Sequence, residues 1–135
     1  MKKLLGIFLV VFDMVTTTLA QKVSVSKVPA VVKTTFAENH PGIKVSWALE
    51  KQNYEAGFTL NGKENSEVYS IRGVLLETEV SIQSGELPAP VLSKLKGIKI
   101  AEAAKITNST GAIIYEAEVK GQDLLFNANG NLLKL

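Results

Sequence analysis

Few side chains in this chain of 135 residues could carry chemistry. The sequence contains no cysteine and one histidine, His40, so a catalytic serine with an acid would have to use that single imidazole as its base. His40 precedes Pro41 and Gly42, where a helix is expected to end. This position favours a polar turn residue with a local hydrogen bond. We therefore predict no catalytic residue and no enzyme activity.

Metal ligation is also disfavoured by the residue types. One histidine without thiolates cannot supply the nitrogen and sulphur ligands that zinc usually takes. Calcium loops need several carboxylates close together, and Asp123 is the only aspartate after residue 20. The sequence predicts no metal site and no cofactor.

Two pairs of carboxylates have a spacing that could suit acid and base catalysis. Glu77 and Glu79 are two residues apart, as are Glu116 and Glu118, and residues two apart on a strand project from the same face. A solvated sheet face has the same spacing, and we favour that interpretation. The lysines available as cross-strand partners are Lys44, Lys51, Lys99, Lys105 and Lys120.

Aromatic side chains fall mainly at positions where core packing is expected. The set comprises Phe36, Trp47, Tyr54, Phe58, Tyr115 and Phe126. Trp47 is the exception to watch, because an aromatic ring on a sheet edge or open face could anchor a partner. It is the one candidate binding residue that the sequence offers.

The first twenty residues have the layout of a secretory signal peptide. Lys2 and Lys3 precede an apolar run over residues 4–12, and a small residue, Ala20, ends the segment. An apolar run of nine residues is much shorter than the roughly 20 needed to span a bilayer as a helix. We predict cleavage after Ala20, a periplasmic or secreted protein, and no membrane association afterwards.

The remaining chain is nearly neutral. Without Lys2, Lys3 and Asp13, the 15 basic and 13 acidic side chains become 13 and 12. Nucleic-acid binding would need a basic stripe that contacts several phosphates, and this balance does not favour one. We expect no nucleic-acid partner.

The secondary-structure elements that must position all these residues occur twice along the chain. Three motifs recur at offsets of 59, 61 and 57 residues, a drift that short loop insertions produce. They are Val28-Pro29-Ala30 with Leu87-Pro88-Ala89, Tyr54-Glu55-Ala56 with Tyr115-Glu116-Ala117, and Gly73-Val74-Leu75-Leu76 with Gly130-Asn131-Leu132-Leu133.

Each repeat is predicted to be a helix followed by four antiparallel strands, because the apolar spacing changes from three and four to two. Residues 28–82 should form a helix over 29–38 and strands around 43–49, 54–60, 67–71 and 74–82. Residues 87–135 should form a helix over 87–96 and strands over 99–107, 112–120, 123–127 and 131–135. Residues 21–27 could add an edge strand.

The fold class that follows is α+β. Neither repeat is large enough to bury a stable core alone, so we expect one domain over residues 21–135. It would be one antiparallel sheet of up to eight strands with both helices on one face and the other face open to solvent.

The order and spacing of these motifs resemble the PepSY-like family of beta-lactamase-inhibitor-like proteins, which are small exported proteins common in Bacteroidetes. The resemblance covers residues 28–135 and includes His40-Pro41-Gly42, Trp47 and the two Tyr-Glu-Ala motifs. It implies the fold of the beta-lactamase inhibitor protein, but no catalytic site. Inhibition of a beta-lactamase or a protease is implied by the fold alone.

The function predicted from the sequence is an exported, non-enzymatic binding or inhibitory module. Its open sheet face would hold a periplasmic or secreted protein or peptide. The alternative is a structural or envelope-stress component without a high-affinity ligand. Large apolar residues on the open face would favour binding, and a uniform face of Lys, Glu, Thr and Ser would favour the alternative.

Overall fold

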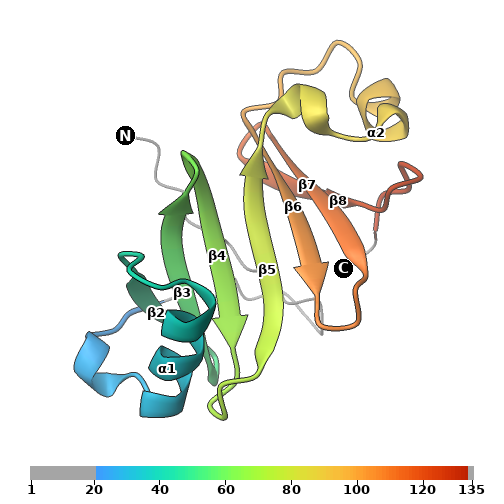
Figure 1. Ribbon diagram of the computed structural model, residues 1–135. Coiled ribbons are helices and arrows are strands. Elements are labelled where there is room, and N and C mark those ends of the chain that lie inside the picture. Colours follow the sequence, from blue (N-terminus) through green and yellow to red (C-terminus); the bar gives the residue numbers. More distant parts are fainter. Residues whose placement is uncertain (1–20, 134–135) are drawn as a thin grey trace. The chain divides into compact units, whose positions relative to one another are not determined.

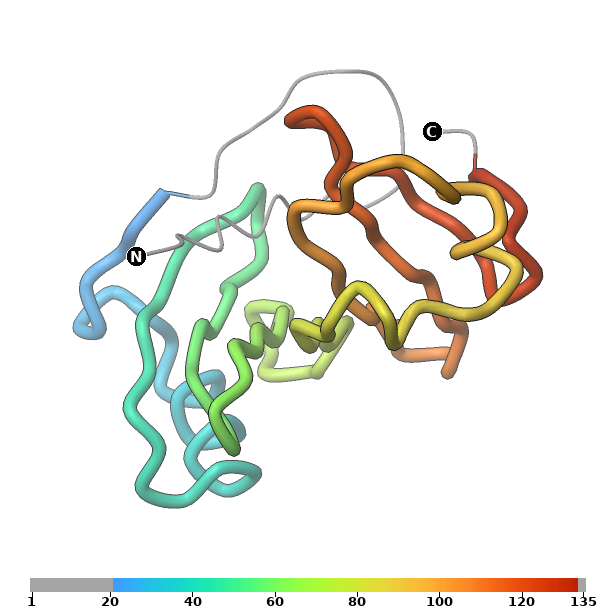
Figure 2. The backbone as a smooth tube through the Cα atoms, turned by 90° about the horizontal axis from the view of Figure 1, so that it is seen from above, coloured from blue at the N-terminus to red at the C-terminus, as the bar shows by residue number. Residues whose placement is uncertain are grey.

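The computed structural model describes residues 21–133, so the predicted signal peptide lies outside the described residues (Figure 1). The described chain falls into two compact units, residues 21–78 and 79–133. Figure 2 follows the backbone of each unit, the first from blue to green and the second from yellow to red. Each unit is described by itself below.

Unit 1 consists of a helix, several strands and a short lead-in. Its elements are β1 (Gln21–Lys22), the 3₁₀ turn η1 (Val25–Lys27), α1 (Ala30–Asn39), β2 (Ser46–Glu50), β3 (Asn53–Leu60), β4 (Lys63–Tyr69) and the first part of β5 (Leu75–Ile82). The strands β1 to β4 pair antiparallel with their neighbours.

Unit 2 repeats this arrangement with fewer residues. Besides the second part of β5, its elements are the 3₁₀ turn η2 (Ser84–Glu86), α2 (Ala89–Lys94), β6 (Glu102–Asn108), β7 (Ile113–Val119) and β8 (Gln122–Phe126). The eight strands are hydrogen-bonded in the order of the sequence, β1 to β8. The predicted α+β fold with one antiparallel sheet is confirmed.

Two predicted strand boundaries were wrong. Residues 131–135 were expected to form a strand, but the described part of this segment makes only one bridge, from Phe126 to Leu132. The eighth strand is instead β1, where Gln21 pairs with Leu49. The strand predicted over 67–71 starts earlier, at Lys63, directly after the Asn61-Gly62 turn.

The second helix is also shorter than predicted. It was expected over residues 87–96, but α2 covers only Ala89–Lys94. Leu95 leaves the helical conformation with φ −98° and ψ 13°, and Gly97 then adopts a positive φ of 78°. A glycine in this conformation is a common helix stop.

The duplication extends to the core of each unit. Each helix packs against the strands of its own unit, and the segment formed by the helix and its flanking residues contributes three residues to a cluster of seven buried side chains. The matched pairs are Val28 with Leu87, Val32 with Val91, Phe36 with Leu95, Trp47 with Ala103, Ala56 with Ala117, Phe58 with Val119 and Tyr69 with Phe126. Unit 1 therefore carries the larger, aromatic version of the same core.

Three five-residue turns share one pattern that the sequence reasoning missed. The residues at positions 70, 108 and 127 each donate their N–H to the carbonyl four residues later and accept an N–H from a glycine three residues later. The three glycines have φ values of 78°, 85° and 81°. In the second and third turns, the Asn108 and Asn127 side chains also accept backbone N–H groups. The sequence signal is Ser or Asn followed at the third position by Gly.

Two of these glycines also seat the turn against the helix of their unit. A Cβ atom on Gly73 would lie 3.0 Å from Val31 Cγ2 on α1, and one on Gly130 would lie 2.8 Å from backbone atoms of Pro90 on α2. Gly111 has no atom within 4 Å of that position. The repeated glycine therefore permits both the turn and close contact with the helix.

We predict that Gly130→Ala destabilises the protein more than Gly111→Ala. Both substitutions place alanine at a positive φ, which costs about 1 kcal/mol, and only the first also collides with the backbone of α2. The difference should reach about 2 kcal/mol in the free energy of unfolding by urea. Equal losses would mean that contact with the helix is not what requires Gly130.

Candidate functional site

Trp47 lies in the core of unit 1 and not on an open face. Its side chain is 5% exposed, and its ring lies 5.7 Å from that of Phe36 and 6.5 Å from that of Tyr69, measured between centroids. The alternation of β2 points Trp47 toward α1, so the ring packs under the helix. The prediction that Trp47 anchors a partner is corrected by this position.

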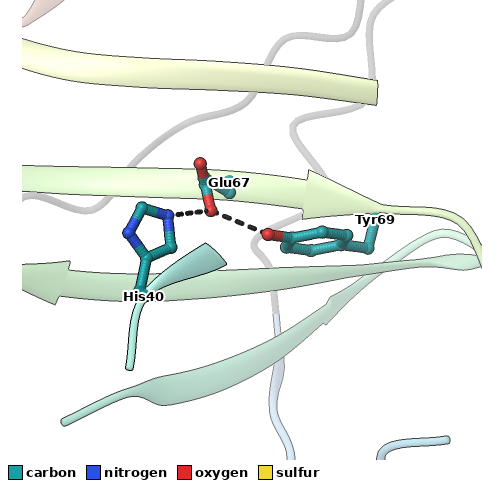
Figure 3. A network of polar contacts seen from close by, with 3 residues as sticks. All are labelled: His40, Glu67 and Tyr69. Carbon is teal, nitrogen blue, oxygen red and sulfur yellow. Dashed lines mark hydrogen bonds and ion pairs between the residues drawn. The ribbon is translucent and has the colours of Figure 1, made fainter. Parts of the chain in front are cut away.

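His40 takes part in a polar network across unit 1 (Figure 3). Its Nε2 lies 2.8 Å from Oε1 of Glu67, and the Tyr69 hydroxyl donates a hydrogen bond of 2.7 Å to the same oxygen. Glu67 is 27 residues away in the chain, so the predicted local hydrogen bond was wrong. The true partner comes from β4.

This network fixes the end of α1 to the sheet. The His40 ring packs against Phe36 and Phe58, with centroid distances of 5.1 Å and 4.6 Å. Burial and the hydrogen bond to Glu67 raise the pKa of Tyr69, which keeps its hydroxyl protonated as a donor. The three groups satisfy one another in the core, and the arrangement is that of a structural support.

The other face of the unit 1 strands has a different character. We call it uncovered face 1, because it is the face away from α1, and define it by the residues of β2 to β4 that alternate with the core residues. These are Ser46, Ala48, Glu50, Asn53, Glu55, Gly57, Thr59, Glu64, Ser66 and Val68. None of them is basic, but Lys22 on the neighbouring strand β1 lies opposite Ala48 and shares this face. Two residues of uncovered face 1, Glu50 and Val68, are nevertheless only 5% and 1% exposed.

Uncovered face 2 is the corresponding surface of unit 2. Its residues are Glu102, Ala104, Ile106, Ile114, Glu116, Glu118, Asp123 and Leu125. No member of this face is basic, although the whole chain has more basic than acidic side chains. Charge is therefore segregated within unit 2.

In the strand register, no lysine stands directly opposite Glu116 or Glu118. Glu118 lies directly opposite Glu102 on β6 and Asp123 on β8, so three acidic residues form one row. Burial and the charge of Glu118 raise the pKa of Asp123. Lys105, one of the expected partners, lies opposite Tyr115.

The solvated interpretation of Glu77 and Glu79 was wrong. Glu79 is 5% exposed, and Glu77 is partly buried. Burial, with a further contribution from Glu55, raises the pKa of Glu77 to about 7. Removal from water therefore favours the protonated carboxyl of Glu77.

Glu50 and Glu55 form the most unusual feature of face 1. Glu50 is 5% exposed, and among the described residues its Oε2 atom has no hydrogen-bond partner. The Oε2 atom of Glu55 is likewise buried without a partner. Burial raises the pKa of Glu55 to about 7, and burial together with the charges of Glu55 and Glu77 raises the pKa of Glu50 to about 8, although Lys51 acts in the opposite direction.

Sequence reasoning did not single out these two carboxylates. Glu50 follows Leu49 and precedes a turn, so it resembles an ordinary solvent-facing residue at a strand end. Only the pairing of Ala48 with Glu55 and of Glu50 with Asn53 makes Glu50 a diagonal neighbour of Glu55. The signal in the sequence would have been the absence of basic residues from one phase of three successive strands.

No site for a metal ion is found in the described part of the chain, where no three His, Asp or Glu side chains gather suitably. Over residues 21–133, no helix has the length and apolar character required to cross a membrane.

Comparison with solved structures places this architecture among known proteins. A DUF2874 family protein from Bacteroides ovatus is similar with a TM-score of 0.69 and 22% identity, covering 78% of this chain and 84% of its own. A BLIP-like protein from Bacteroides fragilis has a TM-score of 0.64 and 19% identity over the same shares. The chain has a BLIP-like fold.

A third similar structure bears on the cellular location of the protein. It is a Bacteroides eggerthii protein provisionally named as periplasmic, with a TM-score of 0.72 and 18% identity, covering 78% of this chain and 86% of its own. No protein-family model matches the sequence, and no curated protein matches it. The BLIP-like resemblance is thus confirmed at the level of fold, and membership of a PepSY family stays a prediction.

We predict that His40→Ala lowers the free energy of unfolding by about 2 kcal/mol, because it removes one partner of the buried Glu67 carboxylate. Glu38→Ala, at an exposed position near the end of α1, should change the free energy of unfolding by less than about 0.5 kcal/mol. Urea denaturation at pH 7 measures both. A loss no larger than that of the control would contradict the structural role.

We predict that stability falls as pH rises from 5 to 8. The folded state retains protons on Glu50, Glu55 and Glu77 up to pKa values of about 8, 7 and 7, whereas the unfolded chain loses them near 4.5. The unfolded state therefore binds fewer protons in this window, and the free energy of unfolding decreases.

The variant that isolates this effect is Glu50→Gln. It should raise the free energy of unfolding at pH 8 by about 2 kcal/mol and have little effect at pH 5, where Glu50 is protonated in the folded state. Glu64→Gln, at an exposed position of the same face, is the control. The prediction fails if Glu50→Gln is no more stable than the wild type at pH 8.

Proposed function

We propose that this protein is a non-enzymatic binding module whose uncovered sheet faces hold a protein or peptide. The observation that carries the proposal is the pair of buried carboxylate oxygens on Glu50 and Glu55, which have no hydrogen-bond partner among residues 21–133. Such groups reduce stability when nothing binds them, and a cost of this kind is typical of functional surfaces.

The chemistry of uncovered face 2 also supports binding over a purely structural role. That alternative predicts a uniform face of charged and hydroxyl side chains. Instead, the partly buried Ile114 lies among the acidic residues of this face, together with Ile106 and Leu125, which are only 8% and 4% exposed. A surface that combines apolar and charged groups is typical of protein interfaces.

The periplasm or the exterior is the proposed location. The signal-peptide pattern over residues 1–20 and the provisional periplasmic name of a structurally similar protein support it. Inhibition of a beta-lactamase or a protease would be one form of such binding, supported only by the likeness to a BLIP-like fold.

Site-specific photo-crosslinking in the producing cells tests the proposal. Benzoylphenylalanine in place of Thr59 would report on uncovered face 1, and the same crosslinker in place of Thr34 would report on α1, since both threonines are exposed. We expect a discrete crosslinked species from position 59 and not from position 34.

Saturation separates a real partner from random collisions. The crosslinked band should reach a limit as the bait is overexpressed. Crosslinking from position 34 alone, or the same diffuse products from both positions, would contradict binding through the uncovered face.

A further inference from the structure

We infer that the Asn61-Gly62 turn is a site of spontaneous covalent modification, at which Asn61 loses its side-chain amide and becomes aspartate or isoaspartate. Both reacting groups belong to the protein itself, and water is the only other reactant. The inference is independent of the proposed function, because it concerns the hairpin turn between β3 and β4 and needs no partner.

The reaction joins two groups that are neighbours in the chain. The backbone nitrogen of Gly62 gives up its proton and attacks Cγ of Asn61. A nitrogen–carbon bond forms, the bond from Cγ to Nδ2 breaks, and the side-chain nitrogen leaves as ammonia. Water then opens the resulting succinimide ring at either carbonyl carbon, which yields an aspartyl or an isoaspartyl residue, and no atom is oxidised or reduced. Glycine after the asparagine favours the reaction because it has no Cβ to hinder the attack.

The turn leaves both reacting groups unrestrained. Asn61 and Gly62 are exposed, with the positive φ values of 52° and 75° that a two-residue hairpin turn needs. Among the described residues, neither the Gly62 N–H nor the Asn61 side chain forms a hydrogen bond. No described atom lies within 4 Å of the position that a Cβ of Gly62 would take. Only the pair of Leu60 with Lys63 closes the hairpin here, so the turn can open locally at a small cost in free energy.

A second asparagine-glycine pair in the same chain has the opposite environment. The Gly130 N–H donates a hydrogen bond of 3.0 Å to the Asn127 carbonyl, and the Asn129 N–H donates one of 3.0 Å to Asn127 Oδ1. Gly130 is buried so closely against Pro90 that a Cβ atom would lie 2.8 Å from the Pro90 backbone. The nitrogen that would have to attack is held in the turn and packed against α2, so this pair is protected.

Modification at Asn61 alters the turn itself. An isoaspartyl residue lengthens the backbone by a carbon atom, and the length of a two-residue loop fixes the register of the strands that it joins. That register places Glu67 on β4 where it meets His40 and accepts the Tyr69 hydroxyl. The isoaspartyl form should therefore be less stable than the unmodified protein.

Ageing of the purified protein tests the inference. Protein produced from the full chain is incubated at pH 8 and at pH 6, and peptide mapping by mass spectrometry follows the loss of amide at Asn61 and Asn129. Enzymatic methylation of isoaspartyl groups identifies that product separately. We expect Asn61 to react at least about tenfold faster than Asn129, because Gly130 must first lose a hydrogen bond and a helix contact. Both rates should be higher at pH 8, since the attacking nitrogen must lose its proton.

Variants and an unfolded control separate the effect of the fold from that of the local sequence. In urea that unfolds the protein, the two asparagines should react at similar rates. Asn61→Gly, which suits the same type of turn, should prevent the modification and keep its stability through an incubation in which the wild type loses stability. Asn127→Ala removes the side-chain acceptor of the second turn, so it should speed the reaction at Asn129 and leave that at Asn61 unchanged.

Three outcomes would overturn the inference. The first is reaction of Asn129 as fast as Asn61 in the folded protein. The second is an intact Asn61 in the folded protein over a period in which the same residue converts in urea. The third is a difference between the two sites that persists in urea, because it would assign the difference to the local sequence and not to the fold.

Discussion

Each unit of this protein depends on packing of one helix against one face of its strands. In unit 1, Val32 and Phe36 on α1 meet Trp47 on β2 in the same buried cluster. In unit 2, Val91 on α2 and Leu95 directly after it lie in the corresponding cluster. Removing this apolar surface from water is the main favourable term in folding. A single helix can cover only one face, so the alternate residues of the same strands are left to serve another purpose.

The two copies of the unit have diverged mainly in how they fill that core. The ring of Tyr69 corresponds to that of Phe126, so unit 1 alone must satisfy a buried hydroxyl. Glu67 accepts that hydroxyl and also contacts His40. The only histidine of the chain is thereby explained by packing and hydrogen bonding in the larger, aromatic core.

The uncovered faces differ from the cores in carrying carboxylates among their residues. Their carboxylates lie beside one another, as in the row of Glu102, Glu118 and Asp123, or beneath neighbouring atoms, as Glu50 does. Like charges directly across strands and unpartnered buried acids both oppose folding.

The sequence by itself determined the duplicated helix-and-strand order, the apolar stripe of each helix and the Asn61-Gly62 turn, because apolar periodicity and turn chemistry act over a few neighbouring residues. It could not determine that Trp47 is covered, that His40 meets a glutamate 27 residues away, or that Glu50 lies beside Glu55. Those facts depend on which strand face the helix covers and on the register between strands. Both are long-range properties, and only the tertiary structure decides them.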